Sequence, residues 1–255
     1  MITVDIRGMK EVQRTLLQAG TQLPFATALA LTRTAEMVKL EERKEMQRVF
    51  RSPTPYTLNA LYLKPATKTR LEAKVWVKDE SAKGTPATKY LLPQVYGGGR
   101  NVKRLEVLMR ARGYMTASEY VVPAEGAQLD AYGNLSRGQL SKILAQLQAA
   151  FDPRQRETPT SRKRSLRRKA RGGRYFIGGA PGRGKHLPRG VWERLTTGFG
   201  YGVRPVLLFV RRPVYVPRFK FFDVAERVVN DQLLYQAQLA VEHALKTARI
   251  VDTTR

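Results

Sequence analysis

The chain of 255 residues contains no cysteine and only two histidines, His186 and His243. Without cysteine it can form no disulfide and no cysteine-zinc site, and it has no thiol nucleophile. Two histidines far apart in the sequence do not suffice for a multi-histidine metal site, nor do they indicate a histidine-based triad. We therefore expect no catalytic residues, no metal and no cofactor, and we expect the protein not to be an enzyme.

Long apolar runs are also missing. No stretch approaches the roughly 18 residues that a membrane-spanning helix requires. The N-terminal residues, MITVDIRG, lack the apolar segment of a signal peptide. Because 42% of the residues are hydrophobic, the composition indicates a globular chain rather than a disordered one. We expect a soluble protein, made inside the cell, with no membrane partner.

Acidic residues are scarce relative to basic ones. The chain has 46 Lys and Arg against 21 Asp and Glu, a formal net charge of +25. Such a surplus points to a polyanionic partner, or to an assembly in which neighbouring molecules supply the opposite charge.

The basic residues are densest between positions 162 and 174, where there are eight Lys and Arg and no acid. A run of like charges this dense repels itself, which favours an exposed segment that binds phosphates or a partner over a buried one. A solvated linker and an arm that pairs with acidic neighbours are the alternatives. No aromatic residue lies between Phe151 and Tyr175, so we expect contacts that ignore base sequence. The predicted contact residues are Arg162, Lys163, Arg164, Arg167, Arg168, Lys169, Arg171 and Arg174.

The segment FIGGAPGRGKH, residues 176–186, has the spacing of a nucleotide-binding P-loop, from Gly179 to Lys185. A functional P-loop requires a Ser or Thr for magnesium and a helix directly after it. Here His186 takes the hydroxyl position, and Pro188 would break the helix in its first turn. We predict a surface loop rather than an ATP site.

Two groups of carboxylates could suggest catalysis. Glu72 and Lys74 match the E-x-K end of metal-dependent nuclease sites, but residues 46–71 supply no acid to share a metal. Alternation along a strand already explains both as solvent-facing residues. Glu41, Glu42 and Glu45 lie on a predicted helix among Lys and Arg, and we interpret them as partners in intrahelical ion pairs.

Hydrophobic periodicity predicts the elements of the fold. We expect strands at 2–7, 61–64, 71–78, 120–122 and 205–211, and helices at 10–19, 24–50, 102–112, 222–248 and after the capping-box pair Ser136 and Gln139. The pieces suggest an α+β fold in which two long helices cover an antiparallel sheet built from 2–7, 61–64, 71–78 and 205–211. The predicted domains are a core of 1–79 with 201–255, an inserted loop and helix region at 80–151, and a basic, glycine-rich arm and loop at 152–200.

Four segments together resemble proteins of tailed bacteriophages: RVFRSPTPYTLNALYLKPATKTRLEAKVWVKD, GTPATKYLLPQVYGGGRNVKRLEVLMRARGYM, VVPAEGAQLDAYGNLSRGQLSKILAQLQAAF and RRPVYVPRFKFFDVAERVV. The likeness is to tail proteins related to the minor tail protein Z group of lambda-like phages, and it covers about residues 25–248. The basic segment at 162–174 departs from that family.

The resemblance implies a structural virion protein of the neck or tail that acts in tail completion and head–tail joining and can contact the genome end. It implies a tail-completion-like core, a homo-oligomeric ring, other neck and tail proteins as partners, and double-stranded DNA as a candidate partner. The alternative that the basic segment alone supports is a stand-alone, sequence-independent nucleic-acid-binding protein. A nuclease or NTPase is a third reading, and it would depend on Glu72 or Lys185.

Overall fold

The computed structural model describes residues 3–5, 22–81, 84–161, 163, 174–179, 184–198 and 200–247. The predicted helix at 10–19 lies outside these ranges. The chain divides into two compact units: unit 1 comprises Met1–Gly98 and Tyr215–Arg255, and unit 2 comprises Gly99–Val214. Each helix of the described part is too short or too polar to span a bilayer.

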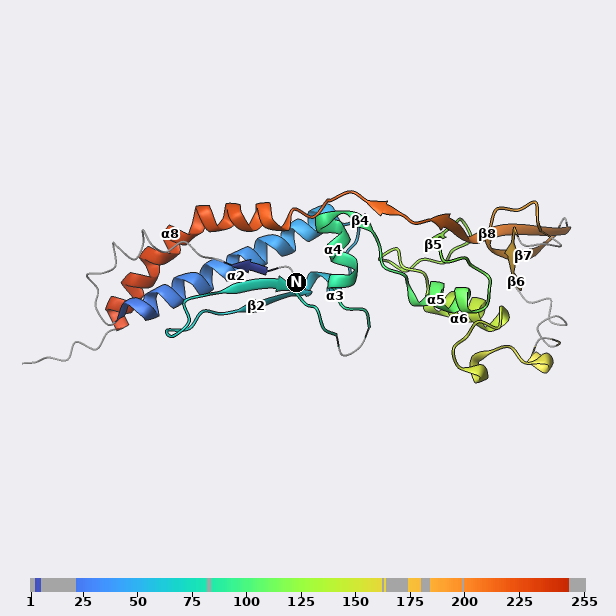
Figure 1. Cartoon of the computed structure of the whole chain (residues 1–255), viewed down its shortest axis with the longest axis horizontal. Helices are drawn as coiled ribbons and strands as arrows, with labels where there is room; N and C mark the ends of the chain where they lie inside the picture. Colours follow the sequence, from blue (N-terminus) through green and yellow to red (C-terminus); the bar gives the residue numbers. More distant parts are fainter. Residues whose placement is uncertain are drawn as a thin grey trace, which may run out of the picture. The chain divides into compact units, whose positions relative to one another are not determined.

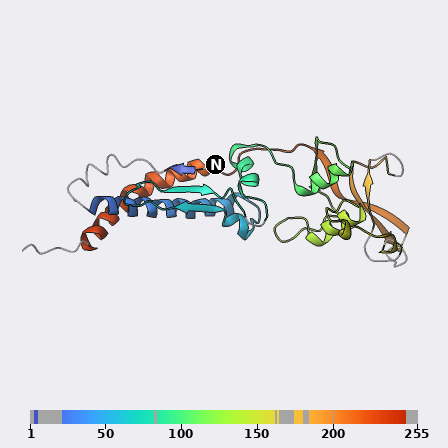
Figure 2. The same ribbon diagram turned by 60° about the horizontal axis from the view of Figure 1, so that its bottom comes forward.

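Two long helices form the largest part of unit 1. They are α2 (Leu23–Val49) and α8 (Phe221–Thr247), which confirms the two predicted long helices. Figures 1 and 2 show them side by side. At one end they meet through a cluster of small side chains, Ala26, Ala30, Ala237, Ala240 and Ala244. Small residues at a helix contact allow a short distance between the helix axes.

A three-stranded antiparallel sheet packs against these helices. Its order is β1-β3-β2, with β1 at Thr3–Asp5, β2 at Leu61–Lys64 and β3 at Lys74–Val77. The predicted hairpin is confirmed, with Leu63 opposite Val75 in the register. Because side chains alternate along a strand, Val75 points into a core that includes Leu31 of α2 and Val224 of α8. An antiparallel sheet packed on long helices is the coarse fold that the sequence predicts.

The described part of unit 1 also contains two shorter helices, α3 (Pro55–Leu58) and α4 (Thr88–Tyr96). Leu91 of α4 is buried with Phe219, Phe221 and Val77 in a second core cluster. Residues 84–98, which the sequence analysis placed in an inserted region, therefore belong to the same unit as the long helices.

Unit 2 contains a four-stranded antiparallel sheet in the order β5-β8-β7-β6. The strands are β5 (Glu119–Pro123), β6 (Arg174–Gly178), β7 (Gly190–Thr197) and β8 (Gly200–Arg211). Its helices include α5 (Arg104–Ala111), α6 (Arg137–Gln146) and the short 3-10 helix η2 (Pro153–Gln155). Met109, Ile143, Val191 and Leu207 are buried together where helices and sheet meet.

One predicted strand pairing is wrong. Residues 205–211 were expected to join the sheet of the long helices, but they form part of β8, which pairs with β5 on one side and β7 on the other. The reason is local: β7 and β8 are joined by a short connection, and a hairpin between neighbouring strands needs no long crossover. Two further short strands, β4 (Gly98–Gly99) and β9 (Val214–Tyr215), pair with each other, and the division between the units falls within them.

Candidate polyanion-binding surface

Most of the predicted contact residues lie outside the described part of the chain. These are Arg162, Arg164, Arg167, Arg168, Lys169 and Arg171. Lys163 is described and is exposed to solvent. Arg174 is the first residue of β6, and its register partner is Arg194 of β7. A role for the basic segment in binding phosphates therefore stays a prediction.

The excess of positive charge is concentrated in unit 2. Its residues include 24 Lys and Arg against 7 Asp and Glu, a formal charge of +17, whereas unit 1 has 22 against 14, or +8. About two thirds of the net charge of the chain therefore belongs to fewer than half of its residues. An anionic partner would experience the strongest attraction near unit 2.

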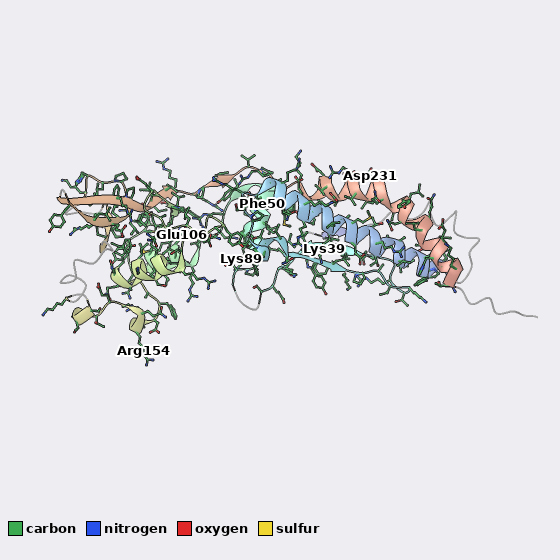
Figure 3. The ribbon with its side chains drawn as sticks, turned by 180° about the vertical axis from the view of Figure 1, so that it is seen from behind. Lys39, Phe50, Lys89, Glu106, Arg154 and Asp231 are labelled. Atoms are coloured by element: carbon green, nitrogen blue, oxygen red, sulfur yellow. The ribbon has the colours of Figure 1, made fainter. Side chains whose placement is uncertain are left out.

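One acid of unit 2, Glu106, is fully buried and is neutralised internally. Its two carboxylate oxygens accept hydrogen bonds from the guanidinium of Arg100, one of them at 2.9 Å, and from the backbone N–H groups of Val121 and Lys103, both at 2.7 Å. Burial would raise the pKa of Glu106, but the hydrogen bonds from Arg100, Val121 and Lys103 outweigh it and hold the pKa below its ordinary value. Through hydrogen bonds to the backbone of Val121, the pair ties the first turn of α5 to β5. Glu106 is labelled in Figure 3.

Two other acids are also paired with arginines. Glu193 of β7 is buried, and Arg204 of β8 donates to it from Nε at 2.8 Å. Glu119 of β5 is half-buried and lies 2.6 Å from Nε of Arg189. The hydrogen bond from Arg189 is the main cause that lowers the pKa of Glu119. In both pairs an arginine lies directly against the carboxylate and compensates its charge locally.

Two of the remaining four acids of unit 2 accept hydrogen bonds from nearby backbone N–H groups. Asp130 accepts hydrogen bonds from the backbone N–H groups of Tyr132 and Asn134, at 2.9 and 2.8 Å, and so stabilises its own turn. Asp152 accepts from the backbone N–H of Arg154 at 2.9 Å. Among the seven acids, all of which are described, the exposed ones are Glu125 and Asp130.

Exposed cations outnumber exposed acids widely. The exposed Lys and Arg of unit 2, within the ranges that the structure describes, are Lys103, Arg104, Arg112, Arg137, Lys142, Arg154, Lys163, Lys185, Arg194, Arg211 and Arg212. Figure 3 shows one of them, Arg154, on η2. Eleven exposed cations against two exposed acids make a surface that attracts polyanions. Sequence reasoning found only the local run at 162–174, because these residues are spread over helices, strands and loops.

The P-loop-like segment forms a hairpin instead. β6 leads into it, but residues 184–186 form a turn, and the chain continues into β7 rather than into a helix. The backbone N–H of Gly179 donates to the carbonyl of Gly184 at 2.9 Å, so it is not free for a phosphate. The prediction of a surface loop that lacks the P-loop architecture is confirmed for these residues.

The E-x-K pair is an exposed ion-pair cluster. One oxygen of Glu72 lies 2.5 Å from Nζ of Lys74, and the other lies 2.8 Å from the Arg70 guanidinium. The hydrogen bond from Lys74, with that from Arg70, lowers the pKa of Glu72 to about 2. No group of three or more His, Cys, Asp or Glu that could hold a metal occurs in the described residues. Glu72 and Lys74 have the surface role that alternation indicates.

Sequence reasoning was partly wrong about the helix glutamates. Glu41 pairs with Lys44 at 2.6 Å, and Glu45 accepts two hydrogen bonds of 2.8 Å from Arg48, as predicted. Glu42, however, is fully buried, and neither of its carboxylate oxygens has a hydrogen-bond partner. Burial, with repulsion from Glu45, raises its pKa to about 9. Glu42 lies on the same face of α2 as the buried residues Val38 and Met46. The charged residues around it in the sequence made that segment look solvent-facing.

No known protein family, curated protein or solved structure matches the chain. The likeness to phage tail proteins therefore depends on the sequence segments alone.

Proposed function

We propose that this protein is a non-enzymatic structural component of the neck or tail of a tailed bacteriophage. In this proposal, unit 1 contributes a tail-completion-like core and unit 2 contacts the genome end. The observation that carries the DNA contact is the surface of unit 2, where three acids are paired inward and exposed cations outnumber exposed acids by eleven to two. The family-like segments of the sequence support the location in the virion.

A ring of identical copies would strengthen this electrostatic contact. Each copy repeats the same charge distribution around the axis, so the positive potential of unit 2 would add up around a central channel or a rim. The same surface could hold the DNA backbone or acidic neighbouring proteins. Its excess of arginine and lysine fits phosphate contacts that are independent of sequence.

Cryo-electron microscopy of the finished virion tests the proposal directly. We expect symmetric density for this chain at the head–tail junction or in the tail, with unit 2 next to DNA density. A virion in which mass spectrometry detects no copy of the chain would overturn the proposal.

The second candidate is a stand-alone nucleic-acid-binding protein, which the basic surface supports without any virion context. In that case the purified chain would bind duplex DNA in solution as a monomer, and it would be missing from finished particles. Presence in the particle decides between the two candidates.

A further inference from the structure

The outward face of the sheet in unit 2 combines aromatic and basic side chains. In the register of β6, β7 and β8, Phe176 lies opposite Trp192, which is itself buried, and Arg194 lies opposite Val203. Tyr201 lies two residues before Val203 on β8, on the same face. The alternate positions, Tyr175 and Glu193 among them, are buried on the inner side of the sheet. Because side chains of a strand alternate between faces, Phe176, Arg194 and Tyr201 lie on the face opposite to Tyr175 and Glu193.

Two of these residues are unusually available for contact. The guanidinium of Arg194 lies over the ring of Phe176, 4.8 Å from its centroid, and so presents a stacked cation to the solvent. Tyr201, near the end of the β7–β8 hairpin, is 92% exposed, and Val203 beside it on β8 is 47% exposed. An aromatic ring so fully exposed gains almost no packing energy from its own chain.

The charge of this face favours an anion. The outward positions of β6, β7 and β8 contain no acid among their described residues, since Glu193 points inward to Arg204. Arg174 holds the register position opposite Arg194. The cation of Arg194 therefore faces no acid among the described outward positions of these strands.

We propose that this face of β6, β7 and β8 binds an unpaired DNA strand, with a base stacked on Tyr201 and a phosphate near Arg194. The inference rests on the proposed contact between unit 2 and DNA, and it specifies that this face binds single-stranded DNA. A free aromatic ring can stack only on a base whose face is open, and the bases of a duplex already stack on one another. An exposed aromatic ring on the same face as a cation is therefore an arrangement that suits a single strand.

The test measures the affinity of the full-length protein for two labelled probes by fluorescence anisotropy. One probe is an oligothymidylate of about 15 nucleotides, within the usual range of single-strand site sizes, and the other is a duplex of similar length. We expect Tyr201→Ala to weaken binding of the oligothymidylate by about five- to a hundredfold, as loss of one stacking contact does, and to leave duplex binding unchanged. Tyr201→Phe, which keeps the ring, should retain wild-type affinity.

A tyrosine remote from this face provides the matched control. Tyr235 of α8 is 55% exposed, and Tyr235→Ala should bind both probes as the wild type does. If Tyr201→Ala binds oligothymidylate as tightly as the wild type, the inference is wrong. If the wild type binds the duplex but not the oligothymidylate, the inference is wrong while the proposed DNA contact of unit 2 stands. If the wild type binds neither probe, that DNA contact is wrong as well.

Discussion

Arg100 and Glu106 form a two-contact ion pair in the interior of unit 2, with Glu106 fully buried and Arg100 8% exposed. Removing the charge of one partner leaves the other uncompensated in a site that excludes water. We expect Glu106→Gln to destabilise the protein by about 3 kcal/mol, the usual cost of breaking a buried pair. Urea unfolding followed by circular dichroism measures the loss.

Glu125 is the control for Glu106, because it is an exposed acid of the same unit. Glu125→Gln should change the free energy of unfolding by less than about 0.5 kcal/mol, as most surface substitutions do. Equal effects of the two substitutions would show that the pair with Arg100 does not stabilise the fold.

Glu42 is as buried as Glu106 but has the opposite pKa shift, because no hydrogen-bond donor meets its carboxylate. Its folded-state pKa of about 9 lies above the ordinary value of 4.5, so the folded protein holds a proton that the unfolded chain releases. Stability should therefore fall as the pH rises from about 4.5 towards 9, by at most about 1.4 kcal/mol per pH unit. Unfolding measured across this range tests the slope.

Glu42→Gln removes this titration and should flatten the pH dependence, so that the variant exceeds the wild type in stability at alkaline pH. Glu41→Gln, which alters an exposed pair with Lys44 on the same helix, should leave the slope in place. A wild-type slope that survives in Glu42→Gln would assign the pH dependence to another group.

Gly190 is the first residue of β7, and the backbone of β8 lies directly against it. A Cβ at this position would lie 2.2 Å from the carbonyl oxygen of Leu207, which cannot move without disturbing the ladder. We expect Gly190→Ala to destabilise unit 2 by about 1–3 kcal/mol, the range for overpacked sites. Thermal unfolding measures the change. Gly202 of β8 has open space around it, so Gly202→Ala should leave the stability of the protein nearly unchanged. That difference would identify crowding at Gly190 as the cause of the destabilisation.

Elements with strong local signals could be predicted from the sequence. Ser136 was predicted to cap a helix, and its hydroxyl accepts a hydrogen bond from the backbone N–H of Gln139 at 3.2 Å. The other half of the capping box does not form. The Gln139 amide instead bonds Gly126 and Gln128, because it is buried between loops that the local pattern does not reveal.

Features that depend on tertiary pairing were missed. β7 contains Glu193 and Arg194 at its centre, and a charged pair within a strand does not resemble a core segment. Glu193 is accommodated only because the register brings Arg204 to it. The basic surface was missed for a similar reason. Its strength depends on which acids are turned inward, and that is decided by contacts between residues far apart in the sequence.

The basic segment at 162–174 can be tested separately from the rest of unit 2. Six of its cations, Lys163, Arg164, Arg167, Arg168, Lys169 and Arg171, can be replaced by glutamine without altering β6. If all six contact duplex phosphates, the slope of log affinity against log salt should become less negative by about 5.

The matched control removes the same charge from exposed positions of unit 1: Lys39, Arg43, Lys64, Lys78, Lys220 and Lys246. Binding titrations over a range of salt concentrations compare the two variants. Equal changes in slope would mean that net charge, rather than this segment, binds the DNA, whereas a change confined to the first variant assigns the phosphate contacts to residues 163–171.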